Sequence, residues 1–241
     1  MIVYLGAQAI GVWLIMFRGV GDRSMAYDRS TVIFSPQGDI IQLEYARKAV
    51  EKGATGLGVR TKEFVVLAGI RKETELIEAP EKIHKLDDHL ATTAAGLQAD
   101  TSALVKRARI QAQIHRLTYG EEITISTLAN QLGEFLQQHT QMGGLRPFGT
   151  QLLFGGKLKE GKSELVLVDP GGAVFRCRAV AIGQNNDPAN EILKKEYSSN
   201  IDREAAKKLV KKALESSIVN AEQEKVEIAI IDDSGVHMGI E

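Results

Sequence analysis

Short β-prone runs and pairs of amphipathic helices alternate along this chain, and this order constrains its fold most. Periods of three to four residues predict two pairs of helices, near 100–119 with 125–141 and near 188–197 with 202–220. Strands are predicted before, between and after these pairs, at 55–59, 64–68, 89–95, 150–154, 164–168, 173–178, 180–182 and 226–231. Strands that alternate with pairs of helices predict an α/β fold in which helices cover the outer faces of the sheets.

A turn and a short capped helix precede the first predicted strand. Residues 35–38 carry the proline and glycine typical of a turn. Asp39 can cap a helix over 40–52, and Gly53 can end it. Apolar residues at intervals of three and four predict one apolar face on this helix: Ile40, Leu43, Ala46 and Val50.

The two long helices that follow are also predicted to bury one stripe each. Asp100 can cap the first, which ends near Tyr119. The stripe expected on the first helix is Ala103, Ile110, Ile114 and Leu117. The stripe expected on the second is Leu128, Leu132, Phe135 and Leu136.

Length and composition exclude several classes of protein. A chain of 241 residues can bury one sizeable core, so one large domain fits better than two. Its net charge of −1 gives no overall attraction to nucleic acid or to an anionic membrane. Cys177 is the only cysteine, which excludes an internal disulfide and is typical of a reducing cytosol. The five histidines lack the spacing of metal ligands, so we expect no metal and no cofactor.

The first 24 residues differ from the rest of the sequence. Residues 1–17 are uncharged and mostly apolar, close to the lower limit for a membrane span or a signal-peptide core. They lack a basic leading segment and a small-residue cleavage site. Three interpretations stay open: a misassigned start, with Met16 or Met25 as the true first residue, which is favoured; an apolar extension; and a membrane anchor, which is favoured least.

A series of short motifs runs in order from about Met25 to the carboxyl end. The motifs are Tyr27-Asp28-Arg29, Phe34-Ser35-Pro36-Gln37-Gly38, Gln42-Leu43-Glu44-Tyr45-Ala46-Arg47, residues 53–58, Glu81-Lys82-Ile83, Ala95-Gly96-Leu97, residues 143–149 and Leu153-Phe154-Gly155-Gly156. Together they resemble the proteasome α subunits, most closely the archaeal kind. The resemblance implies one α-type domain over 25–241 with the four-layer α-β-β-α sandwich of the N-terminal nucleophile hydrolases.

The proteolytic β subunits share that fold, and comparison with them predicts whether this chain has a nucleophile. They use an amino-terminal threonine whose own amine acts as base, tuned by an acid and a lysine. Counting along the strand from Gly58 puts Ala54 at the nucleophile, Ile70 at the acid and Lys82 at the lysine. We therefore expect a non-catalytic subunit. The alternative is an autoprocessed hydrolase that starts at Thr55, but a slip of one residue turns a side chain to the opposite face of a strand.

The resemblance also implies a gate. In the family, seven α subunits form each outer ring of a barrel-shaped protease, β rings carry the nucleophiles, and the α amino termini plug the entry pore. The residues that match the gate cluster are Tyr27, Asp28, Arg29, Pro36 and Tyr45. A turn fixed by proline can place aromatic rings for packing, and a carboxylate can accept a hydrogen bond from a tyrosine hydroxyl.

A second site is implied for Lys82. In the family this lysine lies in a pocket between α subunits and meets the carboxyl terminus of an activating ATPase, whose last residues run hydrophobic, Tyr, any. Gly96, Leu97 and Glu44 match other parts of this pocket. A charge-assisted hydrogen bond to the tail is worth about 1.5–3 kcal/mol when shielded, and several tails gain by effective concentration. The expected partners are α subunits in a ring of seven, β subunits, ATPase tails and unfolded protein substrates in the cytoplasm, without nucleic acid.

Overall fold

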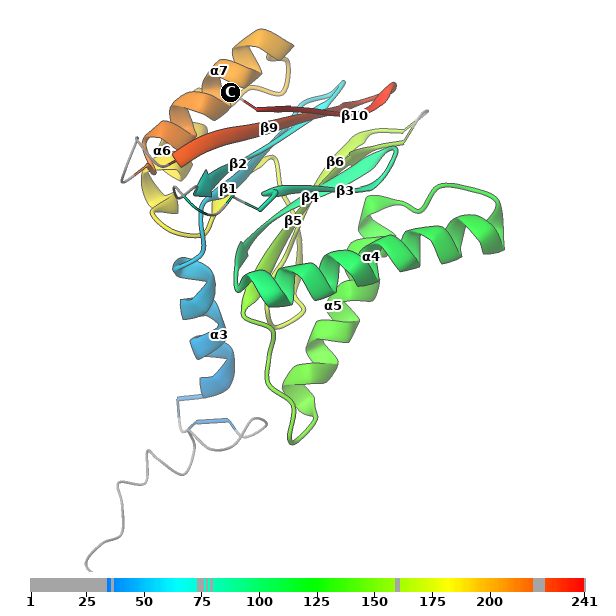
Figure 1. The fold of residues 1–241 in the computed structure, drawn as a ribbon, viewed down its shortest axis with the longest axis vertical. Coiled ribbons are helices and arrows are strands. Elements are labelled where there is room, and N and C mark those ends of the chain that lie inside the picture. The colour runs from blue at the N-terminus through cyan, green and yellow to red at the C-terminus, as the bar shows by residue number, and fades with distance from the viewer. Residues whose placement is uncertain are drawn as a thin grey trace, which may run out of the picture.

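Two antiparallel sheets lie face to face in the computed structural model, which describes residues 34–35, 37–72, 76, 78, 80–158, 161–218 and 224–240 (Figure 1). The first sheet has the order β10-β9-β2-β1-β8 and the second the order β3-β4-β5-β6-β7. The strands of the first sheet are β1 Gly56–Arg60, β2 Val65–Lys72, β8 Ala179–Ile182, β9 Glu224–Asp232 and β10 Gly235–Ile240. Those of the second are β3 Ile83–Asp87, β4 Leu90–Gly96, β5 Thr150–Lys157, β6 Ser163–Val168 and β7 Val174–Arg176.

Helices cover the outer face of each sheet. The helices are α3 Ile41–Glu51, α4 Gln98–Tyr119, α5 Ile125–Gln141, α6 Asn186–Glu196 and α7 Arg203–Glu215. In Figure 1, α4 and α5 lie on the outside of the second sheet, α6 and α7 on the outside of the first, and α3 stands at one end of the sheets. This arrangement confirms the predicted four-layer α-β-β-α sandwich.

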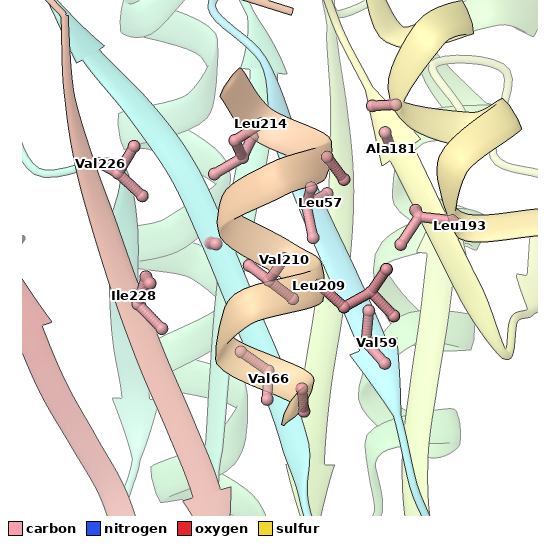
Figure 2. Packing of buried hydrophobic residues seen from close by; sticks show 14 of the residues in the cluster. Leu57, Val59, Val66, Ala181, Leu193, Leu209, Val210, Leu214, Val226 and Ile228 are labelled. Carbon is pink, nitrogen blue, oxygen red and sulfur yellow. The ribbon is translucent and has the colours of Figure 1, made fainter. Parts of the chain in front are cut away.

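Three clusters of buried hydrophobic side chains fill the spaces between the four layers. Under α6 and α7, Leu209, Val210 and Leu214 pack on Leu57 and Val66 of the first sheet (Figure 2). A second cluster lies between α4, α5 and the second sheet and includes Leu104, Leu128, Leu132 and Phe154. The third lies between the two sheets and includes Val65, Leu67, Leu153 and Leu165.

The strand β2 shows why the sequence forms a layer that is buried on both faces. Val66, Ala68 and Ile70 belong to the cluster under α7, whereas Val65 and Leu67 belong to the cluster between the sheets. Successive side chains of a strand point to opposite faces. Because both faces are covered, this strand is a continuous apolar run instead of an alternation of apolar and polar residues.

The helices on the outer face of the second sheet test the predicted stripes. The bounds of α5 agree with the prediction, its Leu128, Leu132 and Leu136 are buried, and Phe135 packs beside them. The stripe predicted for α4 is wrong. Ile110 is 47% exposed, Ile114 49% and Leu117 85%, and Ala103 is exposed as well. The side chains that α4 buries against the sheet are Leu104, Val105, Ala108 and Ala112.

Two predicted helix caps are wrong by one to three residues. The cap of α3 is Ile40, without a side-chain hydrogen bond, while the backbone amide of Asp39 donates to Ser35 Oγ at 3.1 Å. The turn before it is confirmed by the bond from the Gly38 amide to the Ser35 carbonyl, 2.9 Å. The cap of α4 is Leu97, so Asp100 lies inside the first turn. The strands β3 and β10 were not predicted.

No helix in the described ranges is both long and apolar enough to span a bilayer. The apolar residues 1–24, on which the three open interpretations depend, lie outside these ranges.

Candidate functional site

Lys82 is held at four points just before β3. Its amine donates to the carbonyl of Ala54 at 2.5 Å and to the carbonyl of Ala94. Its backbone amide donates to Glu227 Oε2 at 2.9 Å, and its carbonyl accepts from Thr93 Oγ1 at 3.1 Å. Strands β4 and β9 and the segment that leads into β1 thereby fix this lysine. A long side chain fixed in this way loses its rotamer freedom on folding and not on ligand binding.

Two glycines leave room for the aliphatic part of the Lys82 side chain. A Cβ atom added at Gly69 on β2 would lie 2.3 Å from Lys82 Cγ, and one at Gly56 on β1 would lie 3.6 Å from Cε. The first distance is too short for any pair of non-bonded carbons. The lysine therefore crosses the end of the first sheet over backbone that carries no side chain.

The amine of Lys82 reaches a small cavity of about 130 Å³. Ala54, Ile70 and Lys82 line it together, so the three positions that were matched to nucleophile, acid and lysine by counting do meet in space. Only the lysine of the three carries a polar group. Alanine has no atom that can attack a carbonyl, and isoleucine has none that can accept a proton. This geometry supports the prediction of a subunit without a nucleophile.

Thr55, the alternative nucleophile, is bound elsewhere. Its side chain is 2% exposed, and its hydroxyl donates to the carbonyl of Gln184 at 2.5 Å. The nearby Gly53 is buried, and its amide donates to the carbonyl of Val50 in the last turn of α3 at 2.9 Å. Thr55 does not line the cavity that Lys82 reaches. These contacts give no support to catalysis by Thr55.

The structure brings together only part of the pocket that the resemblance implied. Gly96 lines the cavity, and Leu97, half exposed, follows it directly. Glu44 does not line the cavity of its own chain: it accepts from Arg47 at 2.6 Å, and Arg47 also donates to Asp169 at 3.1 Å. The structure therefore does not bring Glu44 together with Lys82 and Gly96 at the cavity.

Only one residue of the predicted gate cluster can be placed. Tyr45 lies on α3 and is half exposed, with the Lys48 amine 5.9 Å from its ring centroid. Tyr27, Asp28, Arg29 and Pro36 lie outside the described residues.

Sequence reasoning missed two charged residues beside Lys82. Arg71 at the end of β2 lines the same cavity, and Glu227 on β9 accepts the backbone amide of Lys82. Glu227 is 3% exposed, and its Oε2 lies 3.7 Å from Arg71 Nη1. An acidic residue inside the apolar run 226–231 was the available signal, because a buried carboxylate needs a partner.

The nearby His84 adds no positive charge to the cavity at neutral pH. Burial lowers the pKa of the His84 imidazole, the carboxylate of Glu81 opposes this shift, and the charges of Arg109 and Lys82 add to it. Within the described ranges, no three His, Cys, Asp or Glu side chains are arranged to hold a metal ion.

Comparison with known proteins identifies the family of this chain. The family model described as Proteasome subunit matches residues 50–231, and the model of the N-terminal signature of A-type proteasome subunits matches residues 27–49. The proteasome alpha subunit of Thermococcus onnurineus is 44% identical over 208 residues, which are 85% of this chain and 79% of that protein. The proteasome alpha subunit of Methanocaldococcus jannaschii is 43% identical over 209 residues, 86% of this chain and 80% of that protein. The chain therefore belongs to the proteasome subunit family and is an α subunit of the archaeal type.

Proposed function

We propose that this α subunit gates substrate entry into the proteasome and docks the carboxyl-terminal tails of a regulatory ATPase through the cavity at Lys82. As an α subunit it is a non-catalytic component of the outer ring; the proposal concerns what it does there. The observation that carries the proposal is the lysine amine held in a small cavity beside Ala54, where a catalytic subunit would have its nucleophile.

The chemistry of the cavity favours binding over hydrolysis. A fixed ammonium group is suited to a carboxylate, because its position needs no further ordering when the ligand arrives. The terminal carboxylate of a peptide is an acceptor for such a group, in a charge-assisted hydrogen bond. Each tail binds weakly alone, and the tails of one ATPase ring gain by effective concentration when several pockets are filled together.

The proposed gate rests on the amino-terminal part of the chain. The match to the amino-terminal signature covers residues 27–49, which contain the whole proposed gate cluster. Tyr45 presents an exposed ring on α3, in the helix that follows the segment of the proposed gate. An exposed aromatic ring is a surface on which a neighbouring segment can pack.

Replacing Lys82 tests the docking role. In assembled α–β particles, we expect Lys82→Ala to abolish most of the stimulation of protein degradation by the ATPase, because every pocket of the ring loses its ammonium group at once. The measurement is the ratio of ATPase-stimulated degradation of a protein substrate to basal cleavage of a small fluorogenic peptide. The control is Lys208→Gln, which removes one positive charge per subunit at an exposed position of α7. A Lys82→Ala particle with the wild-type ratio would refute docking at Lys82.

The competing hydrolase hypothesis has its own simple test. An autoprocessed enzyme would start at Thr55, so its mature chain would lack the first 54 residues. We expect the intact mass of the purified chain to show no such product, and no labelling of Thr55 by an electrophile that captures amino-terminal threonine.

A further inference from the structure

We propose that Arg71 is a second carboxylate-binding residue of the Lys82 cavity and that Glu227 positions both cations. This inference rests on the proposed docking function and deepens it. It states how the cavity recognises its ligand: the terminal carboxylate of a peptide meets a lysine and an arginine together.

Arg71 is placed for this role by strand β2. Arg71 lines the same cavity as Lys82, and only 15% of its side chain is exposed. Its Nη1 lies 3.7 Å from Glu227 Oε2, which is an ion-pair distance and longer than a hydrogen bond. Attraction at this distance keeps the guanidinium beside Glu227 at the wall of the cavity.

Glu227 connects the two cations. The same oxygen, Oε2, accepts the backbone amide of Lys82 and faces Arg71. In the ladder between β2 and β9, Glu227 lies opposite Gly69, the glycine over which the Lys82 side chain passes. One buried carboxylate thus holds the backbone of Lys82 and attracts the guanidinium group of Arg71. Its charge also offsets part of the repulsion between two cations that share a small space.

The size and lining of the cavity indicate the ligand. A volume of about 130 Å³ is well below the roughly 300–1,000 Å³ of small-molecule sites, so it accommodates the end of a chain and not a whole ligand. Ala54 and Gly96 keep the wall small. Arginine presents a planar pair of donors that matches a carboxylate, and lysine adds a point charge. Glu81 at the rim is the acidic lining residue, 68% exposed, and solvent screens its repulsion.

A pair of labelled peptides isolates the carboxylate. One heptapeptide ends in Leu-Tyr-Ala with a free carboxylate, and the other carries a terminal amide instead. Fluorescence anisotropy with assembled α–β particles gives the Kd of each, and the readout is the Kd of the amide divided by the Kd of the carboxylate. Contacts made by the rest of the peptide contribute equally to both Kd values, so they cancel in this ratio. A change of fold that weakens the binding of both peptides equally cancels as well.

The decisive variant is Arg71→Gln combined with Glu227→Gln. The double change keeps the net charge, leaves no buried carboxylate without its cation, and retains an amide oxygen at residue 227 for the Lys82 backbone. We expect its ratio to fall about tenfold, as for the loss of one charge-assisted hydrogen bond. Glu227→Gln alone keeps Arg71 and retains an oxygen that can accept from both the Lys82 backbone and the Arg71 guanidinium, while it removes the competing negative charge. We therefore expect it to have at least the wild-type ratio.

The possible results separate this inference from the docking proposal. A double variant with the wild-type ratio overturns the role of Arg71, and so does a Glu227→Gln single variant that loses as much as the double. If Lys82→Ala lowers the ratio and the double variant does not, docking at Lys82 stands and only the present inference fails. If neither lowers it, both fail. Should the double variant not assemble, Arg71→Lys decides: we expect a ratio lowered at least threefold, and an unchanged ratio overturns the inference.

Discussion

At the scale of single residues, the position of Lys82 depends as much on what its neighbours lack as on what they donate. The lysine side chain occupies the space that a side chain at residue 69 would fill, and it ends on the carbonyls of Ala54 and Ala94. A larger residue on this part of β2 would compete directly with the lysine. The proposed docking function therefore makes Gly69 as important as any charged group.

We expect Gly69→Ala to reduce ATPase-stimulated degradation at least tenfold, because the new methyl group would lie 2.3 Å from Lys82 Cγ and push the amine out of its place. The measurement is the ratio of stimulated to basal turnover in assembled particles. Gly143→Ala is the matched control, since nothing lies within 4 Å of a Cβ at that position. Equal loss in both variants would show that the effect is not local to Lys82.

Asp100 is a second residue whose role is set by distant contacts. It accepts two hydrogen bonds from Arg146, each 2.7 Å, and one from the backbone amide of Gly149 at 2.8 Å. These bonds fasten the loop before β5 to the first turn of α4. The hydrogen bond from Arg146 is the main reason why the pKa of the Asp100 carboxyl lies below its usual value; burial opposes this shift, and Gly149 adds to it.

The lowered pKa predicts how the stability of Asp100→Asn compares with wild type across pH. A carboxyl with a lowered pKa in the folded state stabilises the fold above its ordinary pKa of about 3.9, and this contribution is lost as the pH falls through the folded value. We expect Asp100→Asn to cost about 1–3 kcal/mol at pH 7. At about 2–4 °C per kcal/mol, thermal unfolding at fixed protein concentration detects it. A difference that did not shrink between pH 7 and pH 3 would contradict an ionic origin.

At the scale of elements, α4 has two apolar faces, and only one of them belongs to the core of the subunit. Leu104, Val105 and Ala108 face the second sheet, while Ile110, Ile114 and Leu117 are exposed on the other side. An apolar stripe that the subunit leaves exposed is typical of a surface that another protein covers. Assembly into a particle is the natural setting for such a stripe, because an α subunit works as part of a ring.

The helix α3 is the element on which we expect ring formation to depend most visibly. Its half-buried Leu43 packs on the turn at Gly171. We expect Leu43→Asp to block ring formation, because it removes an apolar contact and puts a charge on the apolar face of the helix. Negative-stain images at micromolar concentration measure this, with Leu43→Met as the control that keeps the face apolar. Rings of Leu43→Asp at the wild-type yield would contradict a role of this face of α3 in ring formation.

At the scale of the whole molecule, the four layers form one packed body, and most residues of the proposed gate precede it in the chain. The two sheets and the five described helices contribute to three clusters of buried side chains, α3 through Val50. The proposed gate cluster belongs to the part of the chain before these layers, apart from Tyr45 on α3. A change to the amino terminus is therefore expected to alter substrate entry without altering the sandwich.

Deleting residues 1–26, all of which precede Tyr27, tests the gate. We expect assembled particles with this deletion to cleave a small fluorogenic peptide several times faster in the absence of any ATPase, because entry no longer waits for the pore to open. Cleavage after addition of the ATPase is the internal comparison, and the stimulated and basal rates should approach each other. Particles whose basal rate stays at the wild-type level would contradict a gate built from this segment.

The sequence by itself determined the layers of this protein, and its resemblance to proteasome subunits implied the place of the missing nucleophile. Periods of two and of three to four residues are local properties, so the order of strands and helices could be predicted before any contact was known. The comparison with the β subunits matched Ala54, Ile70 and Lys82 to a nucleophile, an acid and a lysine, and these three residues line one cavity. The strands β3 and β10 were not predicted, because both are partly polar strands at the edges of their sheets and such strands have weak hydrophobic patterns.

Only the tertiary structure decided which face of α4 is buried and which charges accompany Lys82. Aliphatic residues lie on both faces of α4, so the periodicity is consistent with either, and contact with the second sheet selects one. Glu227 is 145 positions away from Lys82 along the chain. They meet because β9 pairs with β2, which sets Glu227 opposite Gly69, under the lysine. No local sequence pattern predicts this contact between Glu227 and Lys82, because the register of two distant strands is a property of the folded sheet.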